Sequence, residues 1–489
     1  MSLLIVGIDV TIVNVALPAI KRGLDASLSG LQWSVDAYSL VLASLLMASG
    51  SMADRFGRRR VFQVGLVLFT LGSLLCSLAT SVTALVIFRC LQALGGSMLN
   101  PVALSIVSNT FTERRARARA MGIWGAAFGV SLALGPVVGG LLVTGVGWRA
   151  IFWINIPVGL AAIILTRLFV PESKAATARR FDPWGQLLTI VALATLFYGL
   201  IEGPSDGWGS ATIISMFVVA AVATVTLVRV ELGRAQPLIE VRFFRSVPFS
   251  GASLIAVLAF SVLGGFLFLN TLYLQDGRGF SALHAGLLTV PMAVMICVFA
   301  PISGRLVGSR GPRLPLVVAG FAMMAGAAML LRLSGGTSTP YLLASYVVLG
   351  LAFGLVNAPI ANTAVSGMPN SQAGVAASVA SASRQAGSAL GVAITGSIVA
   401  GASDAGLASA SHAAWAVLSL CGLAVAVIGY ASTGKRALGT ARRVREMLAD
   451  EVPGPGVHGA AVTEAATEAV TEEVPGREGR MHDAAVEGS

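Results

Sequence analysis

The chain has 489 residues, of which 55% are hydrophobic and only 11% are charged, and its mean hydropathy is +0.82. A water-soluble domain carries about 25% charged residues, so this composition excludes a soluble fold and indicates a protein that lies in lipid. The formal net charge of +10 raises the possibility of nucleic-acid binding. The basic residues alternate between loops instead of sharing one face, so we exclude nucleic acid as a partner.

Apolar runs long enough to cross a membrane recur along the chain. A hydrocarbon core of about 30 Å requires about 20 apolar residues per helix. Fourteen runs meet this requirement, at residues 2–20, 32–53, 61–79, 83–107, 119–144, 149–169, 184–203, 210–230, 250–275, 282–308, 314–332, 339–366, 375–402 and 411–431. The sequence therefore predicts an all-α membrane protein with fourteen transmembrane helices.

The first run begins at Met1 and has the length of a signal-peptide core. It lacks both a basic segment before it and a small-residue cleavage site after it, so we interpret it as a retained helix. Because this first run is short, two interpretations are open: Met1 is the initiator, or the true start codon lies upstream of it.

Basic residues are distributed unevenly among the loops. They gather after the second, fourth, sixth, eighth and tenth runs, as Arg55, Arg58, Arg59, Arg60, Arg114, Arg115, Arg117, Arg119, Lys174, Arg179, Arg180, Arg229, Arg234, Arg242, Arg245, Arg305, Arg310 and Arg313. By the positive-inside rule these loops face the cytoplasm. The sequence thus predicts a multi-pass protein of the cytoplasmic (inner) membrane with both termini in the cytoplasm.

A repeated spacing suggests two related halves. The matching sets are Gly50, Gly57 and Arg59 after the second run and Gly304, Gly311 and Arg313 after the tenth. Related halves are common in secondary transporters, so we expect a six-helix bundle at 1–170, an inserted pair at 184–230 and a second bundle at 250–431. The acidic, low-complexity segment 450–489 is predicted to be disordered, and the basic segment before it to lie along anionic lipid head groups.

Asp9 lies inside the first apolar run, where a charged residue costs about 2.5 to 3.5 kcal/mol on insertion scales. Its functional interpretation is a carboxyl group that takes and releases a proton. The alternative is an acid that reaches water near the helix end or is held by Thr11 and Asn14. Asp36 is a second such acid, and its position near the outer end of the second run leaves both interpretations open.

The loop after the second run reads Gly-Ser-Met-Ala-Asp-Arg-Phe-Gly-Arg-Arg-Arg from residue 50. Gly50 and Gly57 permit a tight loop, while Asp54 can pair with an arginine or cap the next helix. Such a charge cluster can latch two helices in one conformational state and release them in another. The alternative is that the arginines only set the topology.

The fourth and fifth runs each carry an unusual feature. Arg89, three residues before Gln92, cannot lose its charge and needs a carboxylate, carbonyls or water as a partner. Asp9 is a candidate partner. The alternative is that Arg89 has a structural role and binds backbone carbonyls. The fifth run contains small residues around a proline, at Gly122, Ser131, Gly135, Pro136, Gly139 and Gly140. This pattern predicts a kinked helix that packs closely against its neighbours.

Together these motifs resemble the major facilitator superfamily, and specifically its fourteen-helix drug:proton antiporter family. The similar stretches cover about residues 8–430 and include Trp148-Arg-Ala-Ile-Phe-Trp-Ile-Asn-Ile-Pro-Val-Gly and Arg384-Gln-Ala-Gly-Ser-Ala-Leu-Gly. Ala93 and Ser131 stand where the family's motifs usually have glycine. The resemblance implies a two-bundle fold of six, two inserted and six helices.

The resemblance also implies roles for individual residues. Asp9 and Arg89 would carry proton coupling, Asp54, Arg55 and Arg58 a cytoplasmic gate, and Pro136 with its glycines the antiport direction. Glu202, at the end of the seventh run, would influence the handling of cationic substrates. Asp36, Asn14 and Gln92 are further candidates for substrate or proton contacts.

The sequence therefore predicts a proton-coupled antiporter that exports small amphiphilic organic molecules such as drugs or antibiotics by alternating access. A dedicated exporter of one metabolite is the alternative within this class, and a channel or membrane sensor is the alternative outside it. We expect a monomer surrounded by membrane lipid, with the proton as coupling ion. The chain lacks the phosphate-binding Gly-x-x-x-x-Gly-Lys-Ser/Thr motif and Cys/His metal spacings, so we expect no enzyme activity, cofactor or metal.

Overall fold

The computed structural model describes residues 2–110, 113, 130–131, 134–174, 182–234, 237–369, 372–403 and 406–449. The chain divides into two compact units, residues 1–444 and 445–489. The first unit contains every membrane-length helix found, and the second contributes only the last turn of a helix to the described residues. The expected disordered tail at 450–489 lies outside the described residues.

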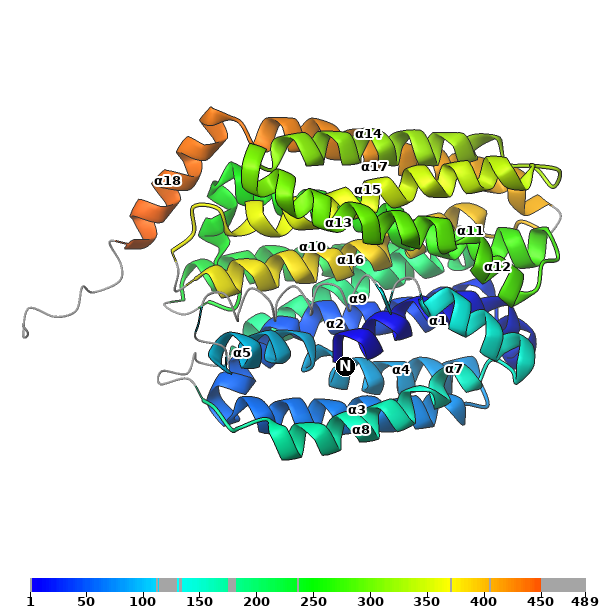
Figure 1. Cartoon of the computed structure of the whole chain (residues 1–489), viewed down its shortest axis with the longest axis horizontal. Coiled ribbons are helices and arrows are strands. Elements are labelled where there is room, and N and C mark those ends of the chain that lie inside the picture. Colours follow the sequence, from blue (N-terminus) through cyan, green and yellow to red (C-terminus); the bar gives the residue numbers. More distant parts are fainter. Residues whose placement is uncertain are drawn as a thin grey trace, which may run out of the picture. The chain divides into compact units, whose positions relative to one another are not determined.

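A first helix group follows the expected runs from the N-terminus. It consists of α1 (Ser2–Leu24), α2 (Leu28–Phe56), α3 (Arg58–Ser77), α4 (Val82–Ser97), α5 (Asn100–Thr110), the helix Leu134–Gly145, α7 (Ala150–Trp153) and α8 (Asn155–Phe169). Within this group α3 packs against α4 and α8, and α2 packs against α4. Figure 1 shows α3 and α8 side by side along one edge of the bundle.

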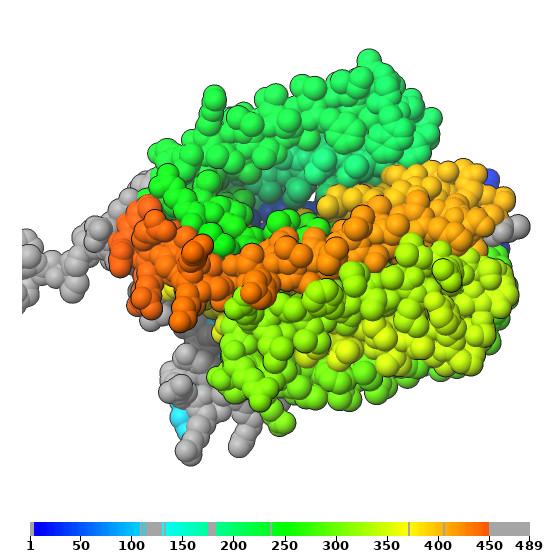
Figure 2. All heavy atoms as spheres, turned by 90° about the horizontal axis from the view of Figure 1, so that it is seen from above, coloured from blue at the N-terminus to red at the C-terminus, as the bar shows by residue number. Residues whose placement is uncertain are grey.

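The inserted pair is a hairpin of α9 (Pro183–Asp206) and α10 (Ala211–Leu232). Its helices pack on each other, and α9 also contacts α2 and α16. One side of α10 exposes Ile214, Val218, Val222 and Val225, each at least half exposed. Figure 2 shows the pair as a ridge that stands apart over much of its length. An exposed aliphatic stripe on a long apolar helix is expected to face lipid.

A second helix group completes the unit. It consists of η1 (Val241–Arg245), α11 (Val247–Leu272), the π-helical turn η2 (Tyr273–Gly277), α12 (Ala282–Leu288), α13 (Val290–Arg310), α14 (Arg313–Met329), η3 (Leu330–Arg332), α15 (Thr339–Val365), α16 (Ala373–Val399) and α17 (Leu407–Ser432), followed by α18 (Lys435–Ala449). Here α11 packs on α16, α14 on α17, and α13 on α15. The two groups meet chiefly where α2 packs on α16 and α1 on α11.

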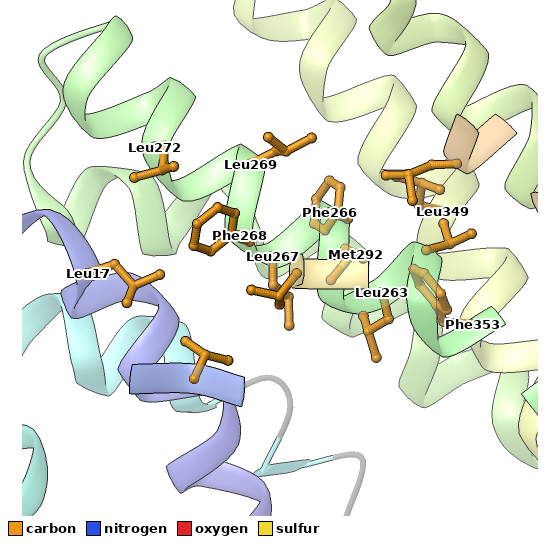
Figure 3. Close-up of a cluster of buried hydrophobic side chains, with 14 of the residues drawn as sticks. Leu17, Leu263, Phe266, Leu267, Phe268, Leu269, Leu272, Met292, Leu349 and Phe353 are labelled. Atoms are coloured by element: carbon orange, nitrogen blue, oxygen red, sulfur yellow. The ribbon is translucent and has the colours of Figure 1, made fainter. Parts of the chain in front are cut away.

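The main hydrophobic core extends across both groups. Leu17 of α1 belongs to the same cluster as Phe266 of α11, Met292 of α13 and Phe353 of α15, and Figure 3 shows these side chains gathered around α11. Burying apolar side chains between helices gives dense packing but, in lipid, no water-driven gain, so close fit between helices has to hold the groups together.

The number of membrane-crossing helices differs from the expectation. Twelve helices in the described residues are long and apolar enough to span a membrane. The expected span 119–144 lies mostly outside the described residues, where only Leu134–Gly145 is seen as a short apolar helix. The expected span 375–402 does form α16, with 27 residues, but its many Ser, Ala and Gly residues and Arg384 make it less apolar. The described residues therefore contain twelve membrane-length helices, and the expected number of fourteen is not confirmed.

The two loops with matching glycine spacing have the same turn. Gly57 ends α2 with φ of 109°, and Gly311 ends α13 with φ of 81°. In each, the glycine N–H donates to the carbonyl four residues earlier, at 3.0 Å and 3.1 Å. A positive φ at a helix end favours glycine because it has no Cβ. The spacing noted in the sequence thus reflects a shared backbone geometry in the two groups.

Candidate functional site

A buried ion pair lies at the centre of the first helix group. Asp9 of α1 and Arg89 of α4 are both at most 1% exposed, and Arg89 Nη1 lies 2.6 Å from Asp9 Oδ2. Both helices are apolar, so water does not compensate these charges and each stabilises the other. The structure thus brings together the two residues that the sequence suggested as partners.

Two amides hold the other carboxylate oxygen of Asp9. Gln92 Nε2 donates to Asp9 Oδ1 at 2.8 Å, and Asn155 Nδ2 of α8 donates to the same atom at 3.0 Å. Both amides also donate to Ser73 Oγ of α3, at 2.5 Å and 3.1 Å. Gln92 Oε1 in turn accepts from Arg89 at 2.6 Å. The carboxylate is therefore oriented by side chains from α3, α4 and α8, which we call the Asp9 cluster.

Sequence reasoning did not assign roles to Asn155 and Ser73. In the sequence, Asn155 stands out only as part of a stretch that resembles the family, and Ser73 does not stand out. A buried Asn in an apolar helix was the available signal, because its amide needs partners that lipid cannot supply. No comparable signal marks Ser73, since a serine can satisfy its hydroxyl group on its own helix backbone.

The Arg89 side chain is enclosed on its remaining sides by α2. Its Nε donates to the Ser34 carbonyl at 3.2 Å, and its guanidinium lies 4.1 Å from the centre of the Tyr38 ring. A cation over an aromatic face in a desolvated site is stabilised by the ring quadrupole. These contacts link the charge state of α1 to the position of α2, which also packs on the second helix group.

Asp36 is placed differently from the sequence expectation. A position near the membrane interface would leave its carboxylate near water, but the side chain is 0% exposed. Neither carboxylate oxygen has a hydrogen-bond partner among the described residues. The reason is tertiary: α2 packs against α4, α9 and α16, and all residues from Ser34 to Ser39 are buried along it. Asp36 does not belong to the Asp9 cluster.

Asn14 is also separate from the Asp9 cluster. Its Nδ2 donates to the Val10 carbonyl on its own helix at 2.9 Å. Its side chain lines a cavity of about 10 Å³ between the helix groups, together with Thr11, Asn270 and Thr289. A polar cavity of this size is near the minimum that holds one water molecule.

The helix groups are joined at one end, which we call the closed end, where α1 finishes and α2 begins. Gln275 Nε2 of η2 donates to the Val15 carbonyl at 2.8 Å. Gln32 Nε2 of α2 donates to the carbonyls of Val392 and Ala393 on α16, at 3.2 Å and 3.0 Å. Buried amides that bond backbone carbonyls across a helix interface fix the relative position of the two helices.

Ion pairs add to the closed end. Asp276, with an 8% exposed side chain, lies 3.8 Å from Lys21 Nζ and 3.6 Å from Arg22 Nη1. The basic partners are largely exposed, so water screens these pairs and each contributes about 0 to 1 kcal/mol. They therefore supplement the buried amide contacts.

The small-residue motif lies between the helix groups. A Cβ on Gly139 would lie 2.7 Å from Ile12 Cγ1 of α1, and one on Gly140 would lie 2.6 Å from the Ala282 carbonyl of α12. A Cβ on Gly135 would overlap Thr11, and the Pro136 carbonyl is in close contact with Gly286. The absence of side chains thus lets one helix approach both α1 and α12. Gly122 lies outside the described residues.

The charged loop motif is fixed by a residue that the sequence did not suggest. Arg58 Nη2 pairs with Asp54 Oδ1 at 2.8 Å, which joins α2 to α3 within one helix group. Glu172, which follows α8, accepts from the Arg59 backbone N–H at 3.1 Å, and a Cβ on Gly57 would lie 2.7 Å from its carboxylate. A carboxylate at a helix start is stabilised by the free N–H groups there.

Other members of the loop motif are less involved. Arg55 is exposed, and its guanidinium lies 5.6 Å from the Phe56 ring. Gly50 lies within α2, and no described atom comes within 4 Å of a Cβ built on it. Among the described residues of the motif, Asp54, Gly57 and Arg58 therefore make the closest contacts.

Glu202 lies away from the Asp9 cluster. Its Oε1 accepts from Trp33 Nε1 of α2 at 2.8 Å, and its Oε2 accepts from Ser205 Oγ at 3.1 Å. The Trp33 contact attaches the inserted pair to α2, whereas the Ser205 contact lies within α9. Substrate contact by Glu202 stays a prediction.

Arg384 of α16 is a charged residue to which we had assigned no role. Its Nη2 donates to Ser381 Oγ at 2.6 Å, and its guanidinium lies 5.9 Å from the Phe260 ring of α11. No acidic side chain pairs with it among the described residues. Across the same part of the chain, no group of three or more His, Cys, Asp or Glu side chains could hold a metal ion.

Comparison with known proteins gives a consistent result. Residues 1–392 match the family model described as Major Facilitator Superfamily. The chain is 38% identical over 400 residues to the multidrug resistance protein Stp of Mycobacterium tuberculosis (strain CDC 1551 / Oshkosh), covering 82% of this chain and 74% of that protein. It is 37% identical over 401 residues to the tetracenomycin C resistance and export protein of Streptomyces glaucescens, with the same coverage.

Solved structures show the same fold at low identity. The inward-open conformation of the xylose transporter XylE from E. coli superposes with a TM-score of 0.62 at 15% identity, over 91% of this chain and 97% of that one. The human organic anion transporter MFSD10 gives a TM-score of 0.60 at 14% identity, over 88% and 97%. At this identity the similarity concerns the fold.

Proposed function

The chain belongs to the major facilitator superfamily, and from this premise we propose that it is a proton-coupled antiporter that exports drug-like organic molecules. Export is supported by its relatives, which carry the names multidrug resistance protein, tetracenomycin C resistance and export protein, and puromycin resistance protein. Coupling to protons is supported by the Asp9 cluster. The family membership and the absence of enzyme names among these relatives support a transporter and not an enzyme.

The observation that carries proton coupling is the single carboxylate held by an arginine and two amides inside an apolar bundle. Asp9 supplies the only carboxyl group of the Asp9 cluster, whereas arginine stays protonated and amides are neutral, so Asp9 is the one member that could carry a transported proton. A proton on Asp9 removes the charge that Arg89 pairs with. The freed Arg89 then favours a different arrangement of α1, α2 and α4, which links protonation to helix movement.

Alternating access follows from the two-group architecture. The groups are joined at the closed end through Gln275 and Gln32, and rocking about the midplane would open this end and close the other. In the proposed orientation the closed end faces outward and the charged loops face the cytoplasm. One proton moving down 100 mV and one pH unit supplies about 2.3 plus about 1.4 kcal/mol, which sustains more than two decades of substrate accumulation.

We also propose fourteen membrane-crossing helices. The helix Leu134–Gly145 contacts both α1 and α12 through its glycines, which requires it to lie inside the bundle. Helix α16 packs against α2, α9, α11 and α17, and this packing would let part of its polar surface face protein in place of lipid. Adding the helix that contains Leu134–Gly145 and α16 to the twelve spans gives fourteen. An even number of spans places both termini on the same side, which we propose to be the cytoplasmic side.

The test measures proton release when candidate drugs are added to energised everted vesicles. It compares vesicles that contain the wild type, Asp9→Asn or the control variant Asp206→Asn. Asp206 is an exposed acid at the end of α9. Substrate-dependent proton movement that is lost only in Asp9→Asn supports the proposal. Downhill drug movement without proton movement in the wild type would indicate a uniporter or channel, and movement of one compound only would indicate a dedicated exporter.

A further inference from the structure

A groove with two arginines lies where α11, α17 and α18 meet. It has a volume of about 560 Å³ and is lined by Val247, Ala431, Arg436, Ala437, Thr440 and Arg443. The Val247 N–H donates to Thr440 Oγ1 at 2.9 Å, so the start of α11 is attached to α18 beside the groove. Both arginines are exposed, and no acidic side chain is among the lining residues.

An apolar stripe on α17 leads to this groove. Leu420, Leu423, Val427 and Tyr430 are 64%, 36%, 59% and 61% exposed, and they share a side of the helix that ends at Ala431. From Leu420 to Ala431 the helix rises about 16 Å. This is about half of a hydrocarbon core of about 30 Å, the depth of one leaflet.

The first turns of α18 have the composition of a helix at the membrane surface. Ala437, Ala441 and Val444 are buried, whereas Lys435, Arg436, Arg442 and Arg443 are exposed. The apolar face packs on the protein, where a Cβ built on Gly367 would lie 2.7 Å from Ala441 Cβ, so the exposed basic face is the one left for anionic lipid head groups. The groove therefore opens at the level of the phosphates, while the α17 stripe extends into the acyl region.

We propose that this groove is a binding site for one anionic phospholipid. Its phosphate lies between Arg436 and Arg443, and an acyl chain lies along the α17 stripe. Guanidinium groups present donors that match phosphate oxygens. The stripe gives the lipid a second contact that free phosphate lacks. The inference depends on the membrane location of the chain and, for the cytoplasmic leaflet, on the proposed orientation, but not on proton coupling or on drug export.

Binding can be measured by native mass spectrometry of the full-length protein with added phosphatidylglycerol or phosphatidylcholine. Phosphatidylglycerol should bind the wild type more tightly than phosphatidylcholine. Arg436→Gln with Arg443→Gln should weaken phosphatidylglycerol binding about tenfold or more, since each basic residue near an anionic surface contributes about 1 kcal/mol. Arg442 does not line the groove, so Arg442→Gln, which removes one charge next to Arg443, should weaken binding less than Arg443→Gln alone.

A variant that keeps every charge tests the acyl contact. Ala431 is exposed, so Ala431→Trp fills the groove without disturbing the core and should also weaken phosphatidylglycerol binding. An equal loss in Arg442→Gln would overturn the proposal in favour of diffuse attraction to the basic helix. Unchanged binding in Ala431→Trp, or displacement of the lipid by the same concentration of inorganic phosphate, would overturn it as well. Transport assays play no part, so a failed antiporter proposal would leave this result unaffected.

Discussion

Asp9 and Asp36 are two fully buried carboxylates on neighbouring helices, yet their surroundings differ completely. Asp9 accepts hydrogen bonds from Arg89, Gln92 and Asn155, whereas Asp36 has no partner among the described residues. The same contrast separates Arg89, which is paired with Asp9, from Arg384, which is paired with no acid in that part of the chain. Residue type and burial alone therefore do not distinguish these charges; their hydrogen-bond and ion-pair partners do.

The largest expected effect comes from replacing one acid at a time. Asp9→Asn should abolish substrate-driven proton movement, because the amide cannot carry the proton. Asp36→Asn should keep transport within a few-fold of wild type, since a neutral side chain of the same shape loses no partner at that position. Proton release in everted vesicles distinguishes the two. Equal loss in both variants would show that Asp36 takes part in coupling and would remove the distinction drawn here.

The arginines offer a matched comparison of stability. Arg89→Gln should lower the free energy of unfolding by about 3 to 5 kcal/mol, because it leaves the Asp9 charge buried without its partner. Arg384→Gln should change it by less than about 1 kcal/mol, since it removes one hydrogen bond to a serine. Thermal unfolding of the purified variants in detergent measures both. A large loss in Arg384→Gln would reveal a partner for this arginine.

Replacing Asn155 tests whether the orientation of the Asp9 carboxylate affects coupled transport. Asn155→Ala removes one hydrogen bond to a charged group, a loss of about 1.5 to 3 kcal/mol, and should slow coupled transport about tenfold or more. The pH profile of transport should change as well, which a purely structural role would not cause. Thr166→Ala, on the same helix and bonded to no member of the Asp9 cluster in the described contacts, is the control. An unchanged pH profile would limit Asn155 to packing.

The smallest expected effect is that of Ser73→Ala. Ser73 accepts from both Gln92 and Asn155, but each amide keeps its hydrogen bond to Asp9. The loss should therefore be about 1 kcal/mol, with transport reduced about fivefold or less. Transport rates at several pH values provide the measurement. A loss as large as that of Asn155→Ala would mean that the serine hydroxyl group itself contacts the moving proton.

The sequence by itself determined most of the helices. Twelve of the apolar runs lie within four residues, at each end, of the membrane-length spans found in the described residues, because a lipid-spanning helix requires about 20 apolar residues regardless of its neighbours. The cost of charge in lipid likewise identified Asp9 and Arg89 as unusual. Their pairing was a hypothesis that the structure supports with a distance.

Only the tertiary structure decided which polar groups meet. Asn155, Ser73 and Glu172 are contributed by helices or loops far from their partners in sequence, and no local pattern encodes such a contact. The burial of Asp36 depends on other helices packing against α2, among them α9 and α16. Hydropathy measures what a helix tolerates on its surface, whereas function depends on which side chains face each other across helices.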